Sequence, residues 1–208
     1  MWAIRVMLLV LLGAYVGLAA FLLRRRKQYS RFVENRTINV ALVAIALTLT
    51  WVLVLLPPAA GYRARPDWLR PKTVAVGFAA TGAWLVGAGF TLSLWALRQR
   101  RAVGLQDSPD GLVTSRAYRY FRHPIYTGIL WLALGLALLT RNPDGLMMLP
   151  LIFVAYLTII LLEERHDMGV TFARQYQVYR QTTRMFGPAW LWTAILAVLL
   201  LIAASAWI

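Results

Sequence analysis

The stretch from residue 122 to residue 164, RHPIYTGILWLALGLALLTRNPDGLMMLPLIFVAYLTIILLEE, decides the fold that we predict for this chain. It contains two apolar runs, Ile125–Thr140 and Leu146–Leu162, with basic residues before the first run and acidic residues after the second. About 16 residues at 1.5 Å rise barely cross the hydrocarbon core of a bilayer as a helix. The two runs therefore predict either two short membrane spans or a tilted or re-entrant helical hairpin.

The composition of the rest of the chain also favours a membrane protein. Hydrophobic residues make up 60% of the chain and charged residues 14%, whereas soluble domains have about 45–50% apolar and about 25% charged residues. The other apolar segments of near-spanning length are Trp2–Leu23, Ile38–Leu56, Val74–Leu97 and Ala189–Ile208. We therefore predict an all-α fold, a polytopic integral membrane bundle of about six transmembrane helices (five to six).

The net charge of +14 is explained by the placement of the basic residues. The loops 24–36, 98–122 and 165–184 hold sixteen Lys and Arg residues, and the intervening loops hold six. Cytoplasmic loops of membrane proteins are enriched in Lys and Arg, so we expect these three loops in the cytoplasm and both termini outside. This pattern predicts a multi-pass protein of the plasma or inner membrane and makes a nucleic-acid partner unnecessary.

Two further features exclude other classes. The basic run 24–27 follows the first apolar segment, whereas a secretory signal carries its charges before that segment. The chain has no cysteine, which excludes disulfides and a thiol nucleophile, and we expect no metal. Trp84 and Trp131 fall near the middle of predicted spans, where we expect them to pack.

The residues before Ile125–Thr140 predict an anion site. Proline suits the first turn of a helix, so Pro124 places Arg122 and His123 at the helix N-terminus, which carries free amides and partial positive charge. Gly128 in the next turn lets a ligand or a neighbouring helix approach the backbone. Alternatively, the arginine side chain contacts lipid phosphates and the histidine caps the helix.

Glu163 and Glu164 follow the second apolar run directly. Carboxylates at a helix C-terminus oppose the helix dipole, and charges near the bilayer need a partner. In a hairpin, these glutamates lie at the same end as Arg122 and His123. The pairing predicts either a structural salt bridge or a ligand site.

Phe172, Tyr176 and Tyr179 are spaced as one face of an amphipathic helix, with Arg174, Arg180 and Arg184 between and after them. Taken alone, this pattern is typical of a helix that lies along the membrane surface.

Together these motifs resemble the isoprenylcysteine carboxyl methyltransferase family, which is related to the phospholipid methyltransferases. The resemblance covers about residues 105–188 and rests on the ordered motif GLVTSxxYRYxRHPxYxG from Gly111 to Gly128, the glutamate pair, and FxxxYxxY from Phe172 to Tyr179. This chain has Arg116 and Ala117 where the family usually has Gly-Pro, and Ala173 where it has glycine. The spacing from the glutamates to Tyr176 is one residue longer than expected.

The resemblance implies S-adenosylmethionine as the cofactor, bound at the cytoplasmic side of the C-terminal helices. It implies cofactor binding by Tyr118, Arg122, His123, Pro124, Tyr126, Gly128, Glu163, Glu164, Tyr176 and Tyr179. It implies catalytic roles for Arg119, Glu163, Glu164 and Arg184. We expect three regions: an N-terminal membrane region 1–104, a cofactor-binding region 105–188 and a C-terminal transmembrane helix 189–208.

The expected reaction is methyl transfer to a lipophilic substrate from the bilayer, such as the carboxylate of a prenylated cysteine. The alternatives are a phospholipid N-methyltransferase, an NADPH-dependent membrane reductase of related architecture, and a lipid-binding protein without enzymatic activity.

Overall fold

The fold is seen in a computed structural model that describes residues 2–24, 48, 50–52, 54, 71–103, 112–169 and 172–204. Within these ranges every regular element is a helix, which confirms the predicted all-α class. The helices are α1 (Trp2–Arg24), α4 (Lys72–Val103), α5 (Ala117–Tyr120), α6 (Pro124–Thr140), α7 (Pro143–Glu163), α9 (Ala173–Thr182) and α10 (Ala189–Ala204), and a π-helical turn, η2 (Glu164–Met168), follows α7.

The closest packing in the described fold joins α4 to α6 through glycines. A Cβ atom built on Gly82 would lie 2.7 Å from the carbonyl oxygen of Gly135, and one on Gly89 would lie 2.5 Å from the carbonyl oxygen of Gly128. The earlier glycine of α4 thus meets the later glycine of α6, so the two helices run antiparallel. Only glycine allows the backbones to approach this closely.

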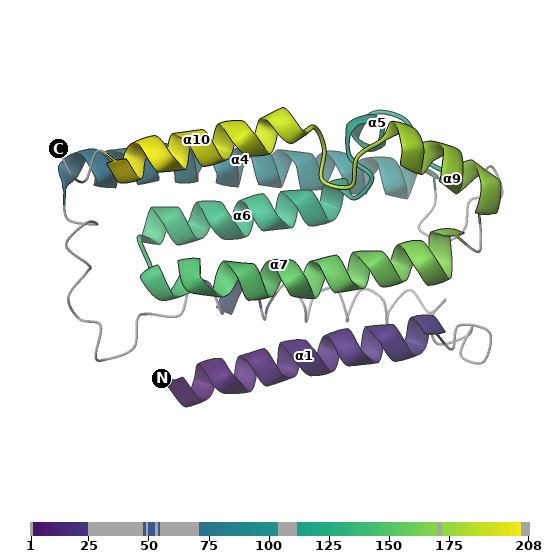
Figure 1. The fold of residues 1–208 in the computed structure, drawn as a ribbon, viewed down its shortest axis with the longest axis horizontal. Coiled ribbons are helices and arrows are strands. Elements are labelled where there is room, and N and C mark those ends of the chain that lie inside the picture. Colours follow the sequence, from purple (N-terminus) through teal and green to yellow (C-terminus); the bar gives the residue numbers. More distant parts are fainter. Residues whose placement is uncertain are drawn as a thin grey trace.

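A short turn joins α6 to α7 and makes them the predicted antiparallel hairpin (Figure 1). Arg141 adopts a left-handed conformation that ends α6, and Asn142 caps α7 by accepting a hydrogen bond from the amide of Asp144. Pro143 occupies the first turn, three residues before the predicted start of the run. α7 is therefore 21 residues long.

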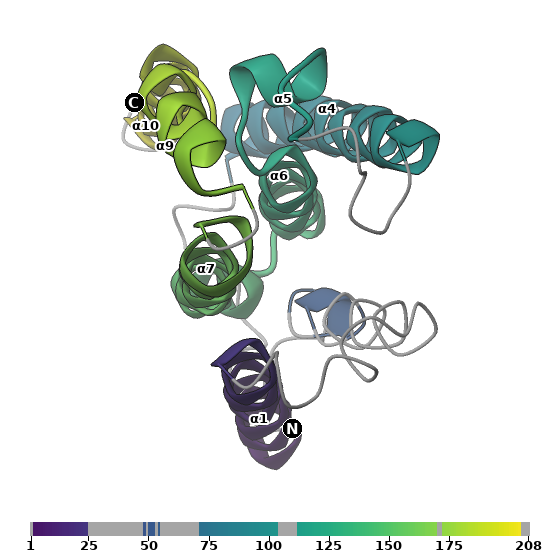
Figure 2. The same cartoon turned by 90° about the vertical axis from the view of Figure 1, so that its right-hand side faces the viewer.

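Two helices of the described chain are long and apolar enough to cross a membrane, namely residues 72–99 of α4 and the whole of α7. α6 and α10 are shorter apolar helices of 17 and 16 residues. The helices run side by side (Figure 1), and the end view shows α6 between α4 and α7, with α1 packed on the outer side of α7 (Figure 2).

The predicted segment Ile38–Leu56 lies largely outside the described residues. Thr50, one of its described members, is buried and shares a 3.0 Å hydrogen bond with the hydroxyl of Tyr156 on α7. The number of spans, the orientation in the membrane and the three-region division stay predictions.

Candidate functional site

The two ends that the hairpin brings together form a buried polar cluster. We use this term for Arg122, His123, Glu163, Glu164 and Tyr176. His123 Nε2 lies 2.9 Å from Glu164 Oε1, and Arg122 Nε lies 3.1 Å from the same oxygen. His123 Nδ1 lies 4.0 Å from Glu163 Oε2. The basic residues before α6 thus face the acidic residues after α7.

The backbone on the α6 side of the cluster is held by the segment that follows α9. The amide of Arg122 donates to the carbonyl oxygen of Arg184 at 3.0 Å, and the amide of His123 donates to that of Met185 at 3.2 Å. The Tyr179 hydroxyl donates to the carbonyl oxygen of Tyr118 at 2.6 Å. These contacts make α9 and the next residues a cover over the start of α6.

Glu164 is held in its ionised form despite its burial. Burial raises the pKa of this carboxyl, but the hydrogen bond with His123, the nearby hydroxyl of Tyr176 and the charges of Arg122 and His123 outweigh the burial and hold the pKa below its ordinary value. Because the carboxylate only accepts hydrogen bonds, the ring nitrogen Nε2 of His123 is the donor.

The two tyrosines of α9 stay protonated. Burial, followed by the neighbouring Glu164 carboxylate, raises the pKa of Tyr176 well above its ordinary value. Burial and the nearby Tyr118 raise the pKa of Tyr179 in the same direction. Both hydroxyls are therefore hydrogen-bond donors, and neither is a base at neutral pH.

Three atoms of the cluster are buried without a well-formed hydrogen bond to any group in the described ranges. They are Arg122 Nε, which has the ion pair but not the alignment for a hydrogen bond, Glu163 Oε2 and the Tyr176 hydroxyl. Buried polar atoms are normally paired, so this group of two donors and one acceptor is unusual. A small polar molecule with both kinds of group would satisfy it.

An aromatic wall lies beside the cluster. The ring of Tyr126 lies 5.9 Å from that of His123 and 5.7 Å from that of Tyr156. The electron-rich faces of such rings attract a cation. The site therefore combines paired charges with a surface suited to a positively charged group.

The structure brings most of the predicted site residues together, but not all of them. Pro124 is fully buried in the first turn of α6. A Cβ atom on Gly128 would collide with Ser93 and lie 2.6 Å from the carbonyl oxygen of Gly89, so α4 occupies the space beside this glycine. Arg119 and Arg184 are exposed. Their predicted roles remain without a structural test.

Sequence reasoning missed Tyr156 as a neighbour of the site. It lies seven residues before Glu163, which is two helical turns and the same face of α7. That spacing was the available signal. Arg180, one of the arginines considered for orienting the acceptor, contributes its backbone here: its carbonyl oxygen accepts a hydrogen bond from Arg122 Nη1 at 2.9 Å.

Comparison with known proteins gives one family. The family model for phospholipid methyltransferase matches residues 77–175, a region that includes most of α4, all of α6 and α7, and four of the five cluster residues. No curated protein and no solved structure matches the chain. The family match supports an integral-membrane methyltransferase.

Proposed function

We propose that the chain is an integral-membrane methyltransferase that uses S-adenosylmethionine and methylates a lipophilic acceptor. The observation that carries the proposal is the buried polar cluster with its three atoms that lack a well-formed hydrogen bond in the described structure, inside or adjoining the family-matched region. Bound S-adenosylmethionine would supply an electrophilic methyl group on a permanent sulfonium cation.

The chemistry of the cluster fits this cofactor. The unpaired acceptor, Glu163 Oε2, suits an ammonium or a ribose hydroxyl, and the donor on Tyr176 suits a carboxylate or a ring nitrogen. The faces of Tyr126 and Tyr176 suit the sulfonium. Tyr118, His123 and Tyr179 then act mainly by fixing this arrangement.

The two glutamates have different proposed roles. Glu164 neutralises Arg122 and accepts the hydrogen bond from His123, so we assign it to positioning. Glu163 keeps a carboxylate oxygen without a hydrogen bond within the described structure, so we assign it to the cofactor.

The site is compatible with two chemical classes of methyl acceptor, a carboxylate and an amine. Methyl transfer is an in-line displacement, so alignment of donor and acceptor and exclusion of water are the main requirements. A carboxylate, such as that of a prenylated cysteine, needs no base, and the exposed Arg119, Arg180 or Arg184 would orient it. A phospholipid amine needs a proton acceptor, so for this acceptor Glu163 would be the base rather than a cofactor ligand. The family match is equally consistent with both acceptors.

A reductase that uses NADPH is the alternative that the binding test below separates. Arg122 and His123 of the buried cluster already face Glu164, so a 2′-phosphate would have to bind the exposed arginines outside the cluster. We place the site at the cytoplasmic face because the Lys- and Arg-rich loops adjoin it.

The test is equilibrium binding to purified protein in detergent, with S-adenosylmethionine, S-adenosylhomocysteine and NADPH as ligands. We expect the first two to bind and Glu163→Gln to weaken them about tenfold, since a charge-assisted hydrogen bond contributes about 1.5–3 kcal/mol. The matched control is Arg165→Gln, a charge removal at an exposed position two residues away.

Transfer of a tritiated methyl group to phosphatidylethanolamine and to N-acetyl-S-farnesylcysteine then identifies the acceptor class. Binding of NADPH alone, or equal cofactor affinity in Glu163→Gln and the parent protein, would refute the proposal.

A further inference from the structure

A row of polar and aromatic side chains leads from the polar cluster into the apolar core. The ring centroid of Tyr126 lies 5.9 Å from that of His123 and 5.7 Å from that of Tyr156. The hydroxyl of Tyr156 shares a 3.0 Å hydrogen bond with that of Thr50, which is 106 residues away in the chain. We use the term polar row for Thr50, Tyr156, Tyr126 and His123. The row joins the start of α6 to α7 and to a segment that precedes α4.

Tyr156 is the fixed point of the polar row. It is 3% exposed and belongs to one apolar core with Ile129 of α6 and Ile152 of α7. Thr50, its hydrogen-bond partner, is fully buried. A hydroxyl among apolar groups needs a hydrogen bond, since its burial otherwise costs free energy. The packing therefore sets the position of the Tyr156 ring, and the bond with Thr50 helps to set its orientation.

Tyr126 is the member of the row that the proposed function places against a sulfonium. It lies in the first turn of α6 and is only partly buried. Its ring is tilted by 43° against that of His123 and by 53° against that of Tyr156, so a neighbour on each side limits how it turns. A cation is attracted over the face of a ring, within about 6 Å of its centre. The angle of the Tyr126 ring therefore governs how strongly it attracts a cation.

We infer that Thr50 and Tyr156 are positioning residues of the cofactor site, which hold the ring of Tyr126 at the angle that favours a bound sulfonium. The inference rests on the proposed function. Thr50 lies outside residues 77–175, the region that the family model matches. Through its contact with Tyr156, the part of the chain before α4 takes part in recognition of the cofactor charge.

Four variants separate positioning from packing. Thr50→Val removes the hydroxyl and keeps the branched shape, and Thr50→Ser keeps the hydroxyl. Tyr156→Phe removes the other partner of the bond. The matched control is Thr158→Val, a change of the same kind on α7, where the Thr158 hydroxyl donates to the carbonyl oxygen of Val154 in its own helix at 2.8 Å.

The first measurement is the affinity of purified protein in detergent for S-adenosylmethionine and for S-adenosylhomocysteine. The two ligands differ by one methyl group and by the positive charge on sulfur. Thr50→Val and Tyr156→Phe should weaken S-adenosylmethionine about fivefold and S-adenosylhomocysteine less than about twofold. Thr50→Ser and Thr158→Val should resemble the parent protein. A role in packing alone would weaken both ligands equally.

The second measurement asks whether the effect passes through Tyr126. Tyr126→Leu removes the ring and should lower the preference for the charged ligand at least as much as Tyr156→Phe does. Adding Tyr156→Phe to Tyr126→Leu should then bring no further change in that preference, because two residues that act through one contact are not additive.

The third measurement needs no ligand. With 3-fluorotyrosine at position 126, the fluorine NMR signal reports the surroundings of that ring in the ligand-free protein. We expect the signal to move in Thr50→Val and Tyr156→Phe, and to return to the parent position in Thr50→Ser. Thr158→Val should not move it.

The inference is overturned by equal weakening of the two ligands in Thr50→Val, by a preference that Tyr156→Phe still lowers without the Tyr126 ring, or by a fluorine signal that does not move. Failure of the parent protein to bind either ligand is a different result. It refutes the proposed function, and the inference with it.

Discussion

His123 Nε2 lies 2.9 Å from Oε1 of Glu164, which joins the residue before α6 to the residue after α7. The contact lies at the open end of the helical hairpin, and the turn with Asn142 lies at the other end. The hairpin is therefore fastened at both ends, and the polar cluster is part of what holds it together.

Substitution of Glu164 is expected to destabilise the fold. Glu164→Gln keeps an acceptor for His123 but leaves the buried Arg122 without its counter-charge, and removal of one partner of a buried ion pair costs about 3–5 kcal/mol. We expect a loss near the lower limit, which lowers Tm by roughly 6 °C or more for a chain of this size. Thermal unfolding in detergent measures it. A shift as small as that of Arg165→Gln would contradict the buried pair.

The same carboxylate predicts a pH dependence. The pKa of Glu164 is lower in the folded protein than its ordinary value of 4.5, so its contribution to stability is complete above that pH. The contribution is lost as the pH falls through the lower pKa of the folded state. We expect the difference in Tm between the parent protein and Glu164→Gln to be constant between about pH 6 and pH 8 and to shrink only in acid. A difference that already shrinks near neutral pH would exclude Glu164 as its source.

The glycines of α4 predict opposite responses to one methyl group. A Cβ atom on Gly89 meets the backbone of Gly128 at 2.5 Å, whereas Gly87 faces open space. Gly89→Ala should separate the helices and cost about 1–3 kcal/mol by overpacking, and Gly87→Ala should gain up to about 1 kcal/mol from helix propensity. Thermal unfolding of both variants decides the matter. Equal effects would show that α4 and α6 are not in backbone contact.

The two tyrosines of α9 form another pair. The hydroxyl of Tyr179 donates to the carbonyl oxygen of Tyr118, whereas that of Tyr176 lacks a well-formed hydrogen bond within the described residues. Tyr179→Phe should therefore cost about 1 kcal/mol of stability. Tyr176→Phe should leave Tm nearly unchanged and weaken S-adenosylmethionine binding several-fold. The reverse pattern would exchange the roles that we assign to them.

Ala173 predicts a stabilising substitution. Its φ is +37°, in the left-handed region that favours glycine, and this is the position where the resembled family has glycine. Ala173→Gly should stabilise the protein by about 1 kcal/mol through relief of strain. The neighbouring Arg174→Gly should destabilise it by about the same amount, because glycine disfavours a helix interior. Loss of stability in Ala173→Gly would contradict the backbone conformation.

The sequence predicted those parts of the site that depend on helix ends. Pro124 marked the start of α6, and the hairpin placed Arg122 and His123 opposite the glutamates, because short connections force neighbouring helices to be antiparallel. The predicted packing of Trp131 is also confirmed, since this residue is buried and contacts Phe121 and Trp192. The same prediction is wrong for Trp84, which touches Trp131 but is 53% exposed. These results need only periodicity and proximity along the chain.

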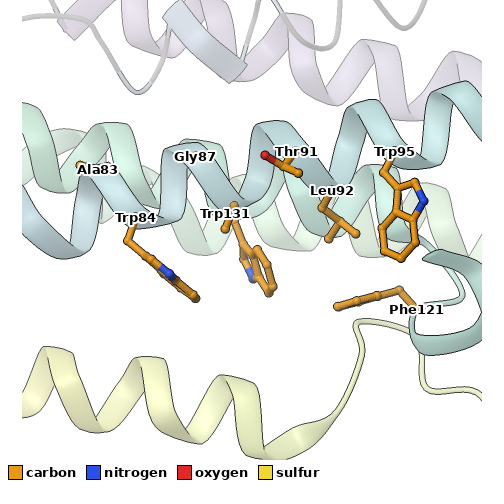
Figure 3. Close-up of a pocket in the computed structure, with 9 residues that line it drawn as sticks. Ala83, Trp84, Gly87, Thr91, Leu92, Trp95, Phe121 and Trp131 are labelled. Carbon is orange, nitrogen blue, oxygen red and sulfur yellow. The ribbon is translucent and has the colours of Figure 1, made fainter. Parts of the chain in front are cut away.

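The remaining features depend on contacts between distant segments. The sequence left open whether a ligand or a helix lies beside Gly128, and α4 lies there. It could not assign separate roles to Glu163 and Glu164, because their difference arises from the orientation of Arg122 across the hairpin. The ring contacts of Trp131 with Trp84 and Phe121 were not foreseen, since these residues become neighbours only when α4 packs against α6 (Figure 3).

A π-helical turn, Glu164–Met168, follows α7 directly after Glu163. Such a turn holds one more residue than an α-helical turn, so the side chains after Glu163 are rotated relative to those of a continued α-helix. Tyr176, which follows this turn in the chain, lies close to Glu164.

The glycine contacts between α4 and α6 leave no space at that interface, because the two backbones are already in van der Waals contact. Neither helix can therefore slide or tilt against the other. α10, by contrast, meets α4 through a side chain, Ile202 beside Gly77. Because a side chain can change its rotamer more easily than a backbone can move, a small displacement costs less between α10 and α4 than between α4 and α6.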